Sequence, residues 1–146
     1  IELMIGATTM AHTALEAFAN EIIPDDYEYH TNKRSEIILE VYNKEKIERY
    51  ISLGEKLSVI LPHILDVTSP KGASNCWAGY KKLKNLRDRL IHMKSFDRKS
   101  SGPDQETIWD SLIKAEAPLR RAKAIIYYFT KKMDTKPQWT TVCPIK

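Results

Sequence analysis

The chain has 146 residues, of which 42% are hydrophobic and 29% charged, and Lys and Arg outnumber Asp and Glu by four. This composition excludes wholesale disorder, and the length suits one domain better than two sizeable ones. Five Gly and seven Pro leave little room for a turn-rich all-β fold. We therefore expect residues 1–146 to form a single helical domain, either whole or excised from a longer protein whose neighbouring domains are missing here.

Cysteine and histidine spacing indicates no bound metal or other cofactor. Cys76 and Cys143 form no Cys-x-x-Cys pair, and His12 is a weak candidate ligand because the sequence has no HxxxH or ExxH spacing. Two free thiols are typical of a reducing compartment. No apolar run approaches the roughly 20 residues of a membrane span, and the first ten residues do not resemble a signal peptide. These observations predict a cytoplasmic protein without membrane contact.

The first third of the chain predicts two helical segments. Apolar residues recur at helical spacing from Met4 to Ile22, and Pro24 ends this pattern before a polar loop over residues 25–33. Residues 34–53 favour a helix because Glu and Lys are dense after residue 43. A break is expected at Asn43, and the apolar residues that precede it are also compatible with the start of a strand.

The remaining elements follow from caps, prolines and periodicity. Ser52 and Glu55 have capping-box spacing before an apolar stripe over residues 57–65, in which Pro62 should kink or split the helix. A fourth helix is predicted over residues 76–93. A long seam from Ile108 to Met133 predicts one last helix that bends at Pro118 without ending. The predicted fold class is all-α, an antiparallel bundle of four to five helices.

One basic residue breaks the pattern of the fourth helix. At about 100° per residue, Arg87 points between Leu83, Tyr80 and Ile91 on the apolar face. An unpaired charge there would be costly. Arg87 should therefore pair with a carboxylate of another helix, lie at a subunit interface, or bind an anionic ligand.

The same helix carries an acid–histidine pair. His92 follows Asp88 by four residues, which places both side chains on one side of the helix. A carboxylate bonded to one ring nitrogen would raise the basicity of the other and prepare His92 for acid–base chemistry. The alternative is a surface His beside a surface Asp, which would contribute little.

The string Leu86-Arg87-Asp88-Arg89-Leu90-Ile91-His92 resembles the signature of the HEPN superfamily, in which an Arg and a polar residue precede a His by a few positions. A first helix like residues 14–21, and a segment like residues 55–57 followed by a proline, extend this likeness. The resemblance implies an all-α fold and a metal-independent endoribonuclease whose two protomers bring their Arg and His residues into one cleft.

The resemblance also implies roles for these residues. His92 would act as the general base or acid, Arg87 would bind the phosphate, and Asp88 would orient His92 or Arg87. Attack by the 2′-hydroxyl of the RNA would yield a 2′,3′-cyclic phosphate and a 5′-hydroxyl. Arg87 and His92 point about 140° apart on an ideal helix, so they would meet more easily across a homodimer.

Positive charge is concentrated around this helix. Residues 81–99 contain eight Lys and Arg against two Asp, a local charge of +6, whereas the rest of the chain sums to −2. This predicts either a solvated helix face or a polyanion-binding surface. The residues predicted to bind RNA are Lys81, Lys84, Arg89 and Lys94.

Three functions are compatible with the sequence. The first is a HEPN ribonuclease in a toxin–antitoxin or antiphage system, restrained by an antitoxin or by a regulatory domain of a longer protein. The second is a non-catalytic HEPN-like module for dimerisation or RNA binding. The third is an unrelated helical bundle. The complete set of Arg87, Asp88 and His92 favours the first, because a scaffold does not need it.

Overall fold

Helices form most of this computed structural model, which describes residues 1–31, 40–72, 74–93, 97, 106–115 and 117–140. The long helices are α1 (Glu2–Ile22), α5 (Ser74–Ile91) and α8 (Pro118–Thr130). Shorter ones are α2 (Lys44–Tyr50), α3 (Leu53–Glu55), α4 (Leu61–Ile64) and α7 (Ile108–Ile113), with 3₁₀ turns η2 (Pro70–Gly72) and η3 (Gln138–Thr140). The predicted helical character is therefore confirmed.

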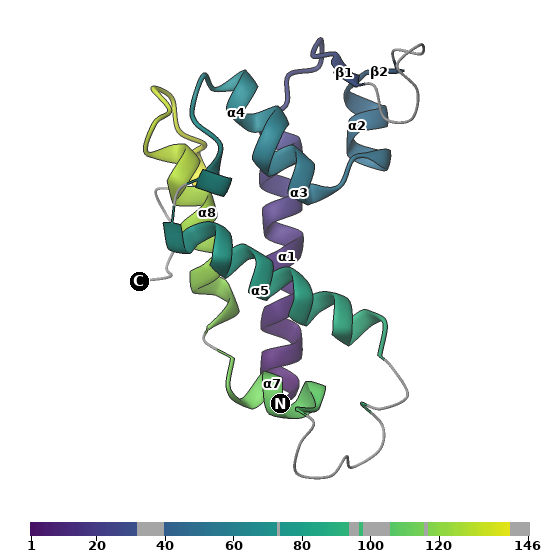
Figure 1. The fold of residues 1–146 in the computed structure, drawn as a ribbon. Helices are drawn as coiled ribbons and strands as arrows, with labels where there is room; N and C mark the ends of the chain where they lie inside the picture. Colours follow the sequence, from purple (N-terminus) through teal and green to yellow (C-terminus); the bar gives the residue numbers. More distant parts are fainter. Residues whose placement is uncertain (32–39, 73, 94–96, 98–105, 116, 141–146) are drawn as a thin grey trace.

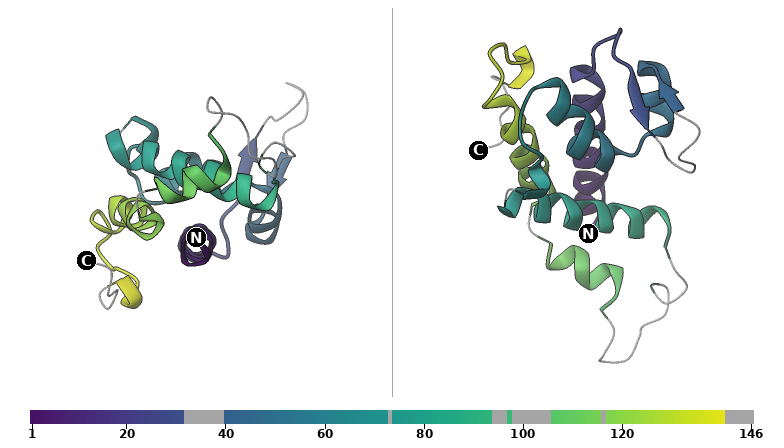
Figure 2. Two further views of the ribbon diagram at one scale, coloured as in Figure 1. Left: turned by 90° about the horizontal axis from the view of Figure 1, so that it is seen from below. Right: turned by 45° about the horizontal axis from the view of Figure 1, so that its top comes forward.

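The arrangement of the three long helices differs from a simple antiparallel bundle. Helices α1 and α8 lie side by side and run in the same direction, and α5 crosses both of them (Figures 1 and 2). Contacts at the two ends agree with this. Met4 at the start of α1 packs near Ile108 of α7, just before α8, whereas Glu21 at the end of α1 accepts a hydrogen bond from Trp139, just after α8.

A small antiparallel hairpin precedes α2. Strand β1 (Tyr29–Thr31) pairs with β2 (Glu40–Tyr42) in a register that places His30 opposite Val41. The helix expected over residues 34–53 is therefore wrong for residues 40–42, and residues 34–39 lie outside the described residues. The predicted break is confirmed, because the Asn43 side chain accepts a hydrogen bond from the Lys46 amide and caps α2.

Pro62 interrupts a helix without ending it. The Ser52 hydroxyl caps α3 by accepting from the Glu55 amide, as predicted. The chain then widens into the π-helical turn η1 (Lys56–Ile60) before α4. Because Pro62 has no N–H, the carbonyl of Ser58 four residues earlier loses its usual helical donor. The Ser69 hydroxyl donates to that carbonyl at 2.7 Å, so the group stays hydrogen-bonded.

Pro118 starts a helix instead of bending one. Helix α7 ends at Ile113, and α8 begins at Pro118, where a missing N–H costs nothing. The predicted continuous helix from Ile108 to Met133 is therefore wrong. Because α8 starts at Pro118, the face of α8 that packs on the core differs from the predicted seam. Ile125 of α8 is fully buried, whereas Leu119 of the predicted seam is 37% exposed.

The core lies where α1, α5, α8 and the α3–α4 segment meet. Its largest buried apolar side chains include Leu15, Phe18, Ile60, Leu83 and Phe129. A second, smaller cluster of Leu86, Ile108 and Leu112 fixes α7 against α5. Among the described helices, none combines the length and the apolar character that crossing a membrane requires.

Candidate functional site

The site is built on α5, which the core holds by one face. Tyr80, Leu83 and Leu86 are buried, whereas Ile91 at the last turn is half exposed. The predicted apolar face is thus real over the first turns and reaches solvent near the end of the helix. The residues of the predicted motif lie at this outer end, where polar side chains can be positioned by the fold and remain accessible.

Arg87, Asp88 and Lys84 form a charged cluster on α5. The Asp88 carboxylate accepts from Lys84 Nζ at 2.5 Å and from Arg87 Nη1 at 3.1 Å. Arg87 and Asp88 side chains are each about one-third exposed, so both can reach a ligand from solvent. Partial burial alone would raise the pKa of Asp88, but the hydrogen bonds and charges of Lys84 and Arg87 lower it overall. Arg87 was expected to pair with a carboxylate of another helix, to lie at a subunit interface or to bind an anion. In the structure it pairs with a carboxylate, but that carboxylate, Asp88, belongs to the same helix.

His12 of α1 lies within electrostatic range of this cluster. Its ring is almost completely buried, and burial followed by the positive charge of Arg87 lowers its pKa below the usual 6.5. His12 is therefore neutral at neutral pH, and it adds no positive charge next to Arg87, which already has Lys84 nearby. Its charged neighbours Arg87, Asp88 and Lys84 lie on another helix, where spacing along the sequence cannot reveal them, whereas Glu16 follows it by four residues on α1.

A polar layer continues from this cluster into the core. Lys56 of η1 is fully buried, and its ammonium group donates to Glu16 at 3.2 Å, Asn20 at 2.9 Å and the Glu48 carbonyl at 3.1 Å. All three donors of Lys56 are thus used, as a buried charge requires. Burial, with the negative charges of Glu16 and Asp88, raises the pKa of Tyr80 to about 12. Glu16 and Asp88 therefore both lie near the buried Tyr80.

His92 follows the last residue of α5 and is exposed. Its backbone amide donates to the Asp88 carbonyl at 2.8 Å, whereas its ring has no hydrogen-bond partner within the described part of the chain. The Asp88 carboxylate is occupied by Lys84 and Arg87. In this arrangement Asp88 positions Arg87, the second of its two predicted roles, and the ring of His92 is not held by it.

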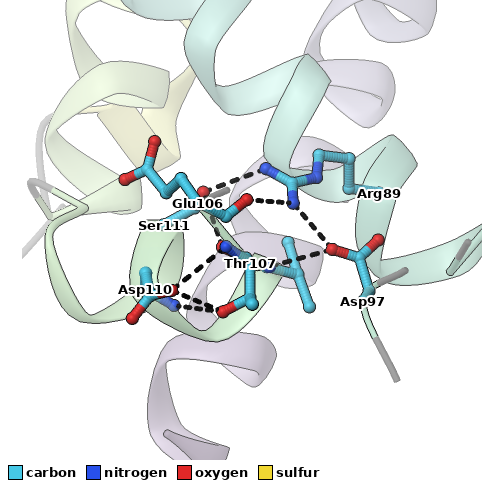
Figure 3. A network of polar contacts seen from close by, with 7 residues as sticks. Arg89, Asp97, Glu106, Thr107, Asp110 and Ser111 are labelled. Atoms are coloured by element: carbon cyan, nitrogen blue, oxygen red, sulfur yellow. Dashed lines mark hydrogen bonds and ion pairs between the residues drawn. The ribbon is translucent and has the colours of Figure 1, made fainter. Parts of the chain in front are cut away.

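Arg89 belongs to a network that joins α5 to α7 (Figure 3). Its guanidinium donates to Asp97 at 2.7 Å, to Ser111 at 3.0 Å and to the Glu106 carbonyl at 3.4 Å. The fully buried Asp97 carboxylate also accepts from the amide of Ile108, the first residue of α7, at 2.9 Å, whereas Thr107 and Asp110 form the capping box of that helix. The first role of Arg89 is therefore structural, and contact with RNA would use only its exposed fraction of 29%.

The other predicted RNA-binding residues divide into two groups. Lys81 is exposed on α5, and Lys84 is partly exposed beside Asp88. Lys94, together with Arg98 and Lys99 of the segment with a charge of +6, lies outside the described residues. The described part of the predicted basic surface therefore consists of α5 itself, where Arg87 and Lys84 share Asp88 as a partner.

Within the described ranges, no group of three or more His, Cys, Asp or Glu side chains is placed to hold a metal ion. Comparison of the chain with protein-family models, curated proteins and solved structures found no match.

Proposed function

We propose that the protein is an endoribonuclease that cleaves RNA by attack of its own 2′-hydroxyl group, with the HEPN-like set of Arg87, Asp88 and His92 at its centre. The observation that supports this most directly is the positioned Arg87. Its guanidinium is held by Asp88, remains about one-third exposed, and stands within one and a half helical turns of an exposed His. A guanidinium fixed in this way is suited to bind a phosphate diester.

The chemistry assigns one task to each residue. His92 removes the proton of the 2′-hydroxyl or supplies one to the leaving 5′-oxygen. The 2′-oxygen bonds to phosphorus as the bond from phosphorus to the 5′-oxygen breaks, and Arg87 stabilises the negative charge on the phosphoryl oxygens. The products are a 2′,3′-cyclic phosphate and a 5′-hydroxyl. Asp88 positions Arg87, and no reaction step requires it to exchange a proton.

The proposal includes a homodimer. Arg87 and His92 point about 140° apart on one ideal helix, so a second protomer is the simplest way to bring an Arg and a His to the same phosphate. The half-exposed Ile91 between them gives this end of α5 apolar surface for such a contact. An antitoxin, or a regulatory domain in a longer chain, would restrain the nuclease within a toxin–antitoxin or antiphage system.

The test is cleavage of single-stranded RNA in the presence of EDTA. His92→Ala should lower the rate by about 10²–10⁴-fold and Arg87→Ala by about 10²–10³-fold. His30→Ala and Arg49→Ala are matched controls, because both side chains are exposed and lie on other elements. Intact RNA with the folded, dimeric wild type would refute the nuclease, and full activity of His92→Ala would refute its assigned role.

A non-catalytic HEPN-like dimerisation or RNA-binding module is the second candidate. It is favoured by the ring of His92, which no side chain of the described residues orients. In that case RNA would bind with an affinity that depends on Arg87 and would be recovered uncut. The same cleavage reactions, followed by analysis of bound RNA, distinguish the two functions.

A further inference from the structure

A basic groove lies between α5 and the α7–α8 segment. One part has a volume of about 510 Å³ and is lined by Lys82, Asn85, Arg89, Glu106, Lys114 and Arg121 among others. A second part of about 530 Å³ is lined by Asn75, Gly79, Arg120 and Arg121 among others. Arg121 lines both parts, and its aliphatic stem packs over Gly79, so the two parts adjoin at Arg121 along α5.

The charge of this groove is strongly one-sided. Of the described residues that line it, five are Lys or Arg and one, Glu106, is acidic. Lys82 and Arg120 are exposed, and within the described part of the chain neither has an acidic partner. Lys114 and Glu106 form an ion pair at 3.3 Å with both side chains more than half exposed, a pair that an anion can displace at little cost.

The groove opens toward the site proposed above. Asn85 lines the groove, and His92 follows it by seven residues on the same face of α5, about 10 Å further along the helix. Lys81 precedes Asn85 by four residues, and it is exposed on that face. A chain of phosphates leaving the groove along this strip would therefore reach His92 at the end of α5. Arg87, two residues after Asn85, points about 160° away from this strip, so the proposed second protomer would supply the Arg87 that meets the same phosphate.

We propose that this groove holds the backbone of the single-stranded RNA that is cut at the end of α5, an inference that rests on the proposed function. Arg120 is exposed, and its planar guanidinium can bond two phosphate oxygens at once, whereas the guanidinium of Arg89 is held by Asp97 and Ser111. Among the described residues, none that lines the groove is aromatic and could stack on a base. Binding in the groove therefore reads phosphate charge and not base sequence, and cleavage specificity must come from elsewhere.

The experiment measures binding separately from cleavage. The probe is a single-stranded RNA with 2′-O-methyl groups, which cannot attack its own phosphates, followed by fluorescence anisotropy at several salt concentrations. The groove variant is Lys82→Gln with Arg120→Gln. The control is Lys46→Gln with Lys136→Gln, which removes the same charge from exposed positions on α2 and after α8.

The groove variant should bind about tenfold more weakly, and the slope of log affinity against log salt should become shallower by about 1.4, the value for two lost phosphate contacts on a single strand. The control should change the dissociation constant less than about twofold.

Equal affinities of the two variants for RNA would refute RNA binding in the groove, even if the wild type cleaves RNA. A groove-dependent loss with no cleavage by the wild type supports the groove and refutes the nuclease. A poly-glutamate peptide that binds in a groove-dependent way, while RNA does not, overturns RNA in favour of an acidic protein partner.

Discussion

The ion pair of Arg89 and Asp97 should determine whether α7 stays attached to α5. Asp97→Ala removes a fully buried carboxylate and leaves the buried Ile108 amide without its acceptor, which costs about 1–3 kcal/mol. Loss of the bond to Arg89 adds about 1 kcal/mol, a value kept low because Arg89 is 29% exposed. Asp97→Ala should therefore lower the free energy of unfolding by about 2–4 kcal/mol, and Tm by roughly 5–15 °C for a domain of this size.

A double-mutant cycle tests the pair itself. Arg89→Ala should cost a similar amount, because it takes the guanidinium away from the buried Asp97 carboxylate. The double variant should cost at least about 1 kcal/mol less than the sum of the single variants. Urea titrations followed by circular dichroism give the unfolding free energies of the wild type, the two single variants and the double variant. Arg49→Ala is the control, because Arg49 is an exposed arginine. Additive costs, or an Arg89→Ala variant that weakens RNA binding without loss of stability, would refute the structural role.

Three further predictions concern the polar groups inside the fold. Lys56→Met should lower the free energy of unfolding by about 2 kcal/mol, because it leaves three hydrogen-bond acceptors unmet, whereas the exposed Lys46→Met should stay within about 0.5 kcal/mol in the same urea titration. Ser69→Ala should cost about 1 kcal/mol in Tm measurements, since the Ser58 carbonyl loses its donor; an unchanged Tm would mean that water replaces the hydroxyl. Burial lowers the pKa of His12 in the folded protein, so the unfolded chain binds the proton more tightly, and stability should fall as pH drops below about 6.5. That fall should be smaller in His12→Gln when unfolding free energies are compared between about pH 7 and pH 5, and equal slopes would contradict the buried neutral ring.

Local signals predicted the elements that depend on local chemistry. The stripe that predicted α1 contains Leu15 and Phe18, which are buried, and Asn43 and Ser52 cap helices as their side-chain chemistry requires. Pro118 was the exception, because an apolar seam with helical period continues across it. Only the three-dimensional packing shows that α7 and α8 are separate helices with different buried faces.

The candidate site could be predicted only in part. Helical spacing paired Asp88 with His92, but the Asp88 carboxylate contacts Lys84, four residues earlier on the same helix, and Arg87, its sequence neighbour. The nearby His12 and the buried Lys56 depend on the crossing of separate segments, which no spacing in the sequence encodes. The structural use of Arg89 was equally hidden, because its partners Asp97 and Ser111 lie 8 and 22 residues further along the chain.

The single guanidinium of Arg89 also has a consequence for how this chain can vary in length. It binds both Asp97 and the carbonyl of Glu106, the residues on either side of the connection over residues 98–105. Arg89 therefore holds Asp97 and Glu106, the residues at the two ends of that connection, close together through contacts that do not involve residues 98–105. Doubling the number of residues between two fixed ends costs only about 0.6 kcal/mol in closure entropy. Insertions at this position, including a whole peptide tag or sensor segment, should leave the packing of α5 on α7 intact, which makes residues 98–105 the natural place to enlarge the protein.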